Sequence, residues 1–509
     1  MKTQERRNTM RESGILLPVF SLPSNYGIGC FSKEAYEFVD QLKAAGQSKW
    51  QILPLGPTGY GDSPYQSFST FAGNPYFIDL EALIQEGLLT EEECMAYDFG
   101  TQEDRIDYEK LYFTRFKVLY QAYQRFAGQK GGDYEKFIEE NKEWLEAYCL
   151  FMALKNKHDG VSWKEWKAPY RDRNIQALEE AAKELAVEID FYRFLQYEFS
   201  RQWEALHAYA NRNGVQIIGD IPIYVAFDSA DTWAAPELFQ FNEENEPRAV
   251  AGCPPDGFSA TGQLWGNPLY DWEYHKRTEY AWWIRRIVHS LKLYDMVRID
   301  HFRGFDEYYA IPYGDKTAEH GTWMPGPGIE FFRIIEEKLG RPNIIAEDLG
   351  FLTDSVLKML EDTGFPGMKV IQFAFDSRES ANYLPHTYTP NCVVYTGTHD
   401  NDTTKGWYRN AGRECREFAK EYLYKDELDE GEQAWDFIVM AMGSVAGLCV
   451  IPIQDYLCRN SDARINTPST LGNNWVWRLK KGEISNTLTK EIRRMTQLYS
   501  RLSPGRTTL

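Results

Sequence analysis

The sequence predicts an α/β fold, a TIM (β/α)8 barrel, from two observations. Short, near-continuous apolar runs recur along the chain and end at Gly, Asp, Glu or His, a pattern typical of parallel strands buried on both faces. Helical stretches fill the intervals, and from residue 344 the runs recur about every 25 residues, near the roughly 31 of an average βα unit. The predicted strands are 50–55, 215–220, 296–300, 343–347, 368–373, 392–396 and 448–453.

Two segments interrupt this rhythm. Residues 82–200 are helix-rich, strand-poor and dense in charged and aromatic residues, which predicts a helical insertion between early barrel strands. Residues 226–275 are loop-like and rich in Pro, Gly and Trp, so we expect a loop insertion that covers the cleft. The 509 residues exceed the roughly 250 of a plain barrel, and we expect 1–509 to form a single decorated barrel unit. Its first helix is predicted at 33–45, ending at Gly46.

The composition narrows the classes of partner. The 15 Trp, 32 Tyr and 29 Phe suit stacking on sugar rings, although such residues also fill cores. The net charge of −19 argues against a nucleic-acid partner, which requires a basic surface. No apolar run reaches 18 residues, so no membrane partner is expected. Eight scattered cysteines without a CxxC pair and a charged N-terminus without an apolar core predict a cytoplasmic location.

Four acidic residues follow predicted strands: Asp220, Asp300, Glu347 and Asp400. A single acid after a strand is more often a helix N-cap than a catalytic residue. In a TIM barrel, however, the carboxyl ends of all strands meet on one face, where catalytic groups lie. Like charges brought together there cost free energy, which proteins tolerate mainly where a shifted pKa serves function.

Asp300 and Glu347 are the natural catalytic pair, because they follow adjacent strands. Cleavage of a glycosidic bond needs a proton donor and a carboxylate that meets the oxocarbenium ion. Neighbouring strands lie roughly 4.8 Å apart, compatible with the 5–5.5 Å between carboxyls that is typical of retaining enzymes. Arg298 lies two residues before Asp300, so we expect both side chains on one side of the strand. There it would orient the nucleophile, a role compatible with a structural ion pair.

The segment 396–402 (TGTHDND) places His399 beside Asp400. These are also metal-ligand types, but no second His cluster has ligand spacing, so we expect no metal. We favour Asp400 as a group that bonds sugar hydroxyls in the transition state, with His399 binding beside it. For His301, packing against the barrel and sugar binding are equally open.

At these residues the sequence resembles the 4-α-glucanotransferases (amylomaltases and plant disproportionating enzymes) of glycoside hydrolase family 77. Each matching segment is weak alone, but together, in order and spacing, they cover nearly the whole chain. They are 14–18 (GILLP), 21–29 (SLPSNYGIG), 50–57 (WQILPLGP), 63–66 (SPYQ), 219–225 (GDIPIYV), 254–268 (PPDGFSATGQLWGNP), 297–305 (VRIDHFRGF), 345–350 (IAEDLG), 397–403 (GTHDNDT) and 474–478 (NWVWR).

The resemblance implies that Asp300 is the nucleophile, Glu347 the general acid/base and Asp400 the transition-state stabiliser. It implies no cofactor, because protein carboxylates suffice. The chain departs from some family members at Gly257, where they carry an aromatic residue, which puts one sugar contact in doubt. The implied sugar-binding residues are Tyr65, Asp220, Arg298, His399, Asp256, Phe258, Trp265, Ser63, Asp376 and Asn474.

The implied substrates are maltooligosaccharides, amylose or other α-1,4-glucans, with glucose as an acceptor. The residues alone leave an amylase-like retaining hydrolase open, because transfer and hydrolysis share the first step. A non-catalytic glycan-binding barrel is disfavoured, since Asp300, Glu347 and Asp400 are all present. A metal-dependent barrel enzyme is the remaining alternative.

Overall fold

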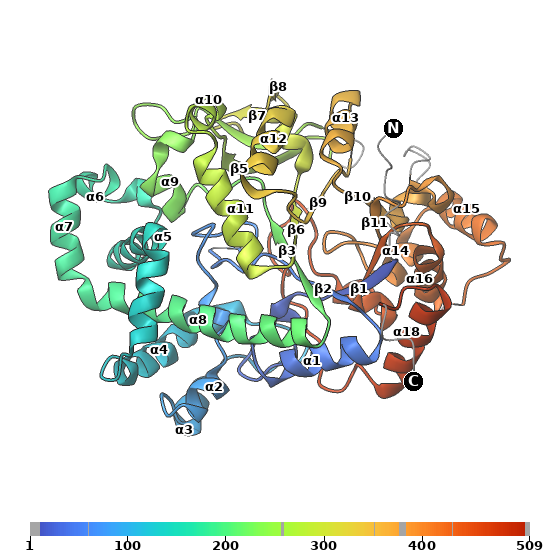
Figure 1. Cartoon of the computed structure of the whole chain (residues 1–509), viewed down its shortest axis with the longest axis horizontal. Helices are drawn as coiled ribbons and strands as arrows, with labels where there is room; N and C mark the ends of the chain where they lie inside the picture. Colours follow the sequence, from blue (N-terminus) through green and yellow to red (C-terminus); the bar gives the residue numbers. More distant parts are fainter. Residues whose placement is uncertain are drawn as a thin grey trace.

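The chain folds around a closed barrel of parallel strands (Figure 1). The computed structural model describes residues 11–59, 61–255, 259–350, 352–375, 383–429 and 431–503. Within them, eight strands follow chain order around the barrel, and the last pairs with the first. The predicted TIM barrel is confirmed. Its strands are β1 (Glu12–Leu16), β2 (Lys49–Gln51), β3 (Gln216–Ile221), β6 (Met296–Ile299), β9 (Ile344–Ala346), β10 (Gly367–Val370), β11 (Cys392–Tyr395) and β12 (Leu448–Pro452).

Seven of these strands fall on the predicted apolar runs, whereas β1 does not. Its sequence, ESGIL, begins with two polar residues and lacks a continuous apolar pattern. It becomes a strand by pairing with β12 on one side and β2 on the other. Gly14 permits that approach, because a Cβ there would lie 2.7 Å from the carbonyl oxygen of Lys49. Long-range pairing therefore decides this strand.

The barrel strands are buried on both faces, which explains their apolar composition. A compact cluster of side chains, among them Ile218, Ile345 and Val393, lies apart from the main core that packs strands against helices. The first helix runs from Lys33 to Ala44 and agrees with the prediction of 33–45. The helices outside the insertions are α1 (Lys33–Ala44), α11 (Ala281–Leu293), α12 (Gly328–Leu339), α13 (Asp354–Thr363), α14 (Thr404–Asn410), α15 (Arg413–Leu423), α16 (Gln433–Gly443), α17 (Ile453–Tyr456) and α18 (Asn486–Leu498).

Helices fill the long connection from β2 to β3 and extend to the left in Figure 1. The two longest, α5 and α8, pack against each other. The predicted limit at residue 200 falls inside α8, which continues to just before β3 and also contacts α1. These helices are α2 (Leu80–Gln85), α3 (Glu91–Met95), α4 (Tyr108–Phe126), α5 (Gly132–Lys157), α6 (Ala168–Arg171), α7 (Ile175–Glu184) and α8 (Ala186–Arg212).

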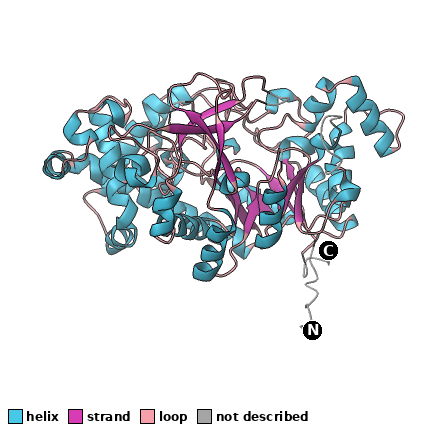
Figure 2. Ribbon diagram, turned by 90° about the horizontal axis from the view of Figure 1, so that it is seen from above, coloured by secondary structure: helices cyan, strands magenta, loops and turns pink. Residues whose placement is uncertain are grey.

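A second sheet stands beside the barrel, so that the strands form two groups with helices outside them (Figure 2). Its antiparallel order is β5-β4-β7-β8. The described residues of the segment 226–275 are therefore not only loop: they contain two strands, a short α-helix and the start of another. The sequence concealed them because β7, which pairs with β4, begins more than 50 residues further along the chain, and Gly and Pro interrupt the alternation. The elements are α9 (Ala230–Ala234), β4 (Ala249–Cys253), β5 (Gln263–Pro268), α10 (Trp272–Arg277), β7 (Glu307–Pro312) and β8 (Thr322–Pro325).

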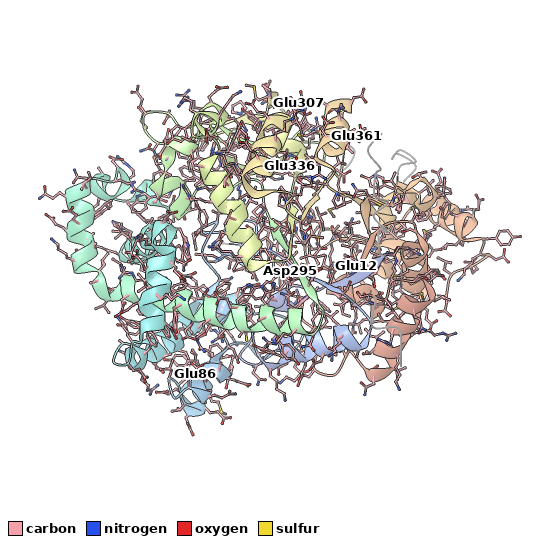
Figure 3. The ribbon with its side chains drawn as sticks, viewed as in Figure 1. Glu12, Glu86, Asp295, Glu307, Glu336 and Glu361 are labelled. Atoms are coloured by element: carbon pink, nitrogen blue, oxygen red, sulfur yellow. The ribbon has the colours of Figure 1, made fainter. Side chains whose placement is uncertain are left out.

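The two ends of the barrel carry different residues. Glu12 opens β1 and Asp295 directly precedes β6, so both mark the amino-terminal end of the strands (Figure 3). The four predicted acids lie at the other end, where the strands lead into their connections. In the described part of the chain, no helix is long and apolar enough to cross a membrane.

Candidate active site

Asp300 and Glu347 lie side by side where two neighbouring strands end. Asp300 follows β6, and its backbone N–H donates to the carbonyl of Ile221 in β3 at 3.0 Å. Glu347 follows β9, and its N–H donates to the carbonyl of Ile299 in β6, also at 3.0 Å. The ladder that pairs Ile299 with Ala346 places the two acids in matching positions. Regular strand pairing thus brings the expected catalytic pair together.

Arg298 joins two carboxylates. Its Nη2 lies 2.8 Å from Oδ1 of Asp300, and its Nη1 donates to Oδ2 of Asp220 at 2.6 Å. Arg298 and Asp300 point the same way, as strand alternation predicts. Burial opposes the charge of Arg298, but the two carboxylates outweigh burial and raise its pKa. The guanidinium therefore stays protonated and supplies a fixed positive charge between the acids.

Tyr65 extends this chain of contacts on the far side of Asp220. Its hydroxyl donates to Oδ2 of Asp220 at 2.9 Å, so that one oxygen receives both Tyr65 and Arg298. Asp220 is only 1% exposed, and burial raises its pKa against the opposing charge of Arg298. Burial likewise raises the pKa of Tyr65, which remains a neutral donor. The contacts run from Tyr65 through Asp220 and Arg298 to Asp300.

Glu347 is placed to carry a proton near neutral pH. Burial, followed by the nearby charge of Asp300, raises the pKa of Glu347 to about 7, although Arg298 opposes the shift. Its Oε2 accepts the N–H of His301 at 2.7 Å, and its Oε1 accepts that of Leu349 at 2.8 Å. A carboxyl with a pKa near the working pH can act first as an acid and then as a base.

His301 does not continue the strand that precedes it. Its φ of 51° is left-handed, and this turn directs its N–H to Glu347. The imidazole meets Trp265 of β5 edge to face, with ring centroids 4.9 Å apart. Burial lowers the pKa of His301 to about 4, so the ring is neutral. The structure gives His301 a backbone contact that orients Glu347 and a ring that packs against the second sheet.

His399 and Asp400 lie on the loop after β11. Oδ1 of Asp400 accepts a hydrogen bond from Nδ2 of Asn466 at 2.7 Å. The same oxygen lies 3.4 Å from Nε2 of His399. The His399 ring stacks on Tyr65, with centroids 5.2 Å apart and planes 15° apart. Burial lowers the pKa of His399, which favours a neutral ring. Because Tyr65 contacts both Asp220 and His399, it links this loop to the Arg298 cluster.

Comparison with known proteins identifies the family. The family model described as 4-alpha-glucanotransferase matches residues 17–485. A 4-alpha-glucanotransferase of Clostridium butyricum is 50% identical over 95% of this chain and 99% of its own length. One from Thermus thermophilus is 47% identical over 97% of this chain and 99% of its own.

The chain belongs to the 4-alpha-glucanotransferase family, glycoside hydrolase family 77.

A solved structure agrees with this assignment. Amylomaltase from Streptococcus agalactiae in complex with acarbose superposes with a TM-score of 0.94 at 40% identity, covering 97% of this chain and all of that one. The family resemblance is thus confirmed, and the hydrolase alternative gives way to transferase activity on α-glucans.

The remaining predicted sugar contacts of this glucanotransferase differ in what the structure gives them. Oγ of Ser63 accepts the N–H of Tyr65 at 3.3 Å and so supports the turn that carries Tyr65. Trp265 is half-buried beside His301. Both ends of the Asn474 amide bond residues of its own loop, because its Oδ1 accepts the Thr467 N–H and its Nδ2 donates to the Thr470 carbonyl. Sugar contact by these residues stays a prediction. Asp256, Phe258, Asp376 and the departure at Gly257 lie outside the described residues.

Several residues that contact the predicted site residues were not predicted from the sequence. Trp475 is buried against both Tyr65 and His399, in a left-handed backbone conformation. Arg464 donates from Nη2 to the backbone carbonyl of Asp400 at 2.6 Å, beside the contact from Asn466. Asp455 is buried beneath the same loop. Asp455 carried a signal, because it follows a predicted strand as the other acids do, and Trp475 lies in the matching segment 474–478.

Proposed function

We propose that this member of the family moves α-1,4-glucan segments from a donor maltooligosaccharide to the 4-hydroxyl of an acceptor glucose or glucan. The reaction is a retaining double displacement through a glycosyl-enzyme on Asp300. The pairing of Asp300 with Glu347 on adjacent strands supports this most directly. One carboxylate is held by Arg298, while the other has a pKa raised to about 7.

In the first step, Glu347 gives its proton to the glycosidic oxygen while a carboxylate oxygen of Asp300 attacks the anomeric carbon. The bond from that carbon to the glycosidic oxygen breaks, and the shortened chain leaves with the proton. An ester bond to Asp300 forms, and Glu347 becomes a carboxylate. The burial that raises the pKa of Glu347 keeps a protonated fraction for this step.

In the second step, the Glu347 carboxylate accepts the proton of the acceptor 4-hydroxyl. The acceptor oxygen attacks the anomeric carbon, and the ester bond to Asp300 breaks. Both acids return to their starting states, and two inversions give net retention. The N–H groups of His301 and Leu349 hold Glu347 in one orientation for both transfers.

The remaining side chains support the ring at the reaction centre. We assign Asp400 to sugar hydroxyls, where its bonds strengthen as the ring flattens. His399 and Tyr65 line the same place with stacked rings, and Asp220 and Arg298 complete the polar wall. Protein carboxylates carry every proton and covalent step, so the mechanism calls for no cofactor.

Maltooligosaccharides and amylose are the proposed donors, and glucose is the smallest proposed acceptor. We place the enzyme in the cytoplasm on the evidence of its cysteines. None of the eight forms a disulfide in the described part of the chain, and five are buried. Free thiols suit a reducing compartment.

Product analysis after incubation with maltotriose tests the proposal, with Asp300→Asn alongside the wild type. The wild type is expected to form glucose and a ladder of longer maltooligosaccharides. The variant is expected to form neither, because an amide cannot replace the nucleophilic carboxylate. Glu361→Gln, on the exposed face of α13, is the matched control and should give the wild-type ladder.

Two outcomes would contradict the proposal in different ways. Glucose and maltose without longer products would mean hydrolysis, and the transfer mechanism would be wrong. A full ladder from Asp300→Asn would mean that another group is the nucleophile. Mass spectrometry of the enzyme quenched during turnover locates the ester and distinguishes these cases.

A further inference from the structure

The loop that carries His399 and Asp400 is held at both ends by one buried carboxylate. Asp455 lies in α17, directly after β12. Its Oδ2 accepts the hydroxyls of Thr396, where the loop leaves β11, and of Thr404, where α14 begins. Its Oδ1 accepts the backbone N–H of Thr404 at 2.7 Å. A single side chain thus ties the start of loop 396–404 to its end.

The neighbouring strand on the other side contributes a second tie. Gln372 follows β10, and its Nε2 donates to the backbone carbonyl of Asp402 at 2.9 Å. Its own N–H donates to the carbonyl of Thr396 at 3.3 Å. Asp455 is 1% exposed and Gln372 is 3% exposed. The two ends of the loop are therefore seated between the ends of β10 and β12, on side chains that are shielded from solvent.

The tip of the loop transmits this seating to Asp400. Oδ1 of Asn401 accepts both the N–H and the hydroxyl of Thr398, at 2.8 and 2.9 Å, which closes the tip into a compact turn. Arg464 holds the backbone carbonyl of Asp400 at 2.6 Å. A turn closed in this way moves as a unit, so a shift at its ends displaces the Asp400 carboxylate.

The charge of Asp455 is costly where it lies. In the described part of the chain, the groups that act most strongly on its charge are Thr396, Thr404 and the carboxylate of Asp402, with no Lys, Arg or His among them. Burial raises the pKa of Asp455, and the Thr396 and Thr404 donors oppose that shift. A carboxylate buried without a cation lowers the stability of the fold, and packing alone does not require it. Such groups are concentrated near functional sites.

We propose that Asp455 is a positioning residue for glucan transfer: it fixes loop 396–404 so that Asp400 meets the sugar ring as the transition state forms. The inference rests on the role proposed above for Asp400. Asp455 lies beneath the loop, bonded to its ends, and acts through Asp400. Asp455 contributes to transfer by fixing the position of the loop, because its one carboxylate accepts hydrogen bonds from Thr396 at the start of the loop and from Thr404 at its end.

The first test is Asp455→Asn, which keeps the shape of the side chain but turns one acceptor into a donor facing two hydroxyls. With maltotriose as substrate, kcat is expected to fall by about 10- to 100-fold, the scale of a small misplacement of a catalytic group. KM should change by less than about threefold, because Asp400 acts chiefly in the transition state. Asp462→Asn, an exposed carboxyl close by in the chain, is the control and should leave both values unchanged.

A double-mutant cycle separates positioning from general stability. The donor is α-maltosyl fluoride, whose leaving group needs no protonation, and the readout is the rate of fluoride release in the first turnover, which reports formation of the glycosyl-enzyme. In an Asp400→Asn background, Asp455→Asn should cause little further loss in the rate of fluoride release, because the carboxylate through which Asp455 acts is already absent. In a Glu347→Gln background, the 10- to 100-fold loss should remain in full.

Two results would overturn the proposal. The first is that Asp455→Asn lowers the rate of fluoride release equally in the wild-type and Asp400→Asn backgrounds. The second is that the variant lowers only the melting temperature, while kcat per folded enzyme stays constant. If Asp455→Asn does not fold, Thr404→Val removes the Thr404 hydroxyl contact and leaves Asp455 in place. Thr404→Val is then expected to lower the rate of fluoride release by a smaller factor, and this decrease must again disappear in the Asp400→Asn background. Wild-type activity of Asp400→Asn itself would instead refute the role of Asp400.

Discussion

Both ends of the barrel carry charged residues, but the charges are paired at one end and crowded together at the other. At the amino-terminal end, each charge has a partner of its own: Lys49 pairs with Glu12 at 2.7 Å, and Asp295 accepts both His207 and the N–H of Ile217. Although burial works against it, the His207 and Ile217 contacts lower the pKa of Asp295. This end therefore holds its charges in stabilising arrangements.

At the carboxyl-terminal end, several acids share one cation. Arg298 contacts Asp220 and Asp300, while Glu347 receives two N–H donors and has a raised pKa. Such an arrangement costs stability and leaves a proton available near neutral pH. The comparison shows that one barrel separates charges that stabilise the fold from charges available for chemistry.

The largest expected effect is the loss of the proton carrier. Glu347→Gln cannot protonate the leaving oxygen, so kcat for maltotriose should fall by about 10²- to 10⁴-fold. With α-maltosyl fluoride as donor, the rate of glycosyl-enzyme formation should be much less affected, since fluoride leaves without protonation. Equal losses with both donors, measured by rapid-quench kinetics, would assign Glu347 a different role.

Removal of one cation from each end sharpens the comparison. Arg298→Met leaves two acids facing each other, so kcat/KM should fall by about 10²-fold. The loss of a buried pair should also cost about 3–5 kcal/mol of unfolding free energy. Lys49→Met should lower the melting temperature while kcat per folded enzyme stays unchanged. A comparable loss of kcat in both variants, measured beside urea denaturation, would contradict the division of roles.

The two ends should respond to pH with opposite signs. The folded pKa of Glu347 lies above its unfolded value of 4.5, so its stabilising contribution is complete below pH 4.5 and is lost as the pH rises towards 7. The stability of Glu347→Gln relative to wild type should therefore rise by roughly 2–3 kcal/mol across this window.

Asp295 provides the opposing case. Because its folded pKa is lowered, its contribution is present above its unfolded value of 3.8 and is lost as the pH falls further. The unfolding free energy of Asp295→Asn should therefore fall less steeply than that of the wild type as the pH decreases below 3.8. Urea denaturation of both variants across pH 3–8 measures the slopes, and slopes of the same sign would be inconsistent with the comparison.

The smallest effect on activity is expected for Ser63, which supports the turn that carries Tyr65. Ser63→Ala removes one weak acceptor for the N–H of Tyr65, so kcat/KM should fall by about 2- to 10-fold, with no change in melting temperature. Initial rates with maltotriose measure the effect. A drop as large as that of Arg298→Met would mean that Ser63 binds the sugar directly.

Most of the site follows from the sequence because it lies on regular strands. Asp300, Glu347 and Asp220 each end an apolar run, and strand alternation places Arg298 beside Asp300. Parallel pairing then brings these positions to one face without further information. The barrel and its main carboxylates were predictable because both depend on local patterns repeated along the chain.

The tertiary structure decided the features that depend on distant partners. β1 exists because β12 and β2 pair with it, and β4 exists because it pairs with β7 on one side and β5 on the other. The left-handed turn at His301, the stacking of Tyr65 on His399 and the ties from Asp455 to Thr396 and Thr404 have no local signature. The sequence alone determines which acids gather at the carboxyl end of the barrel, because strand patterns are local. Their orientation and protonation depend on burial and long-range contacts, which only the folded chain creates.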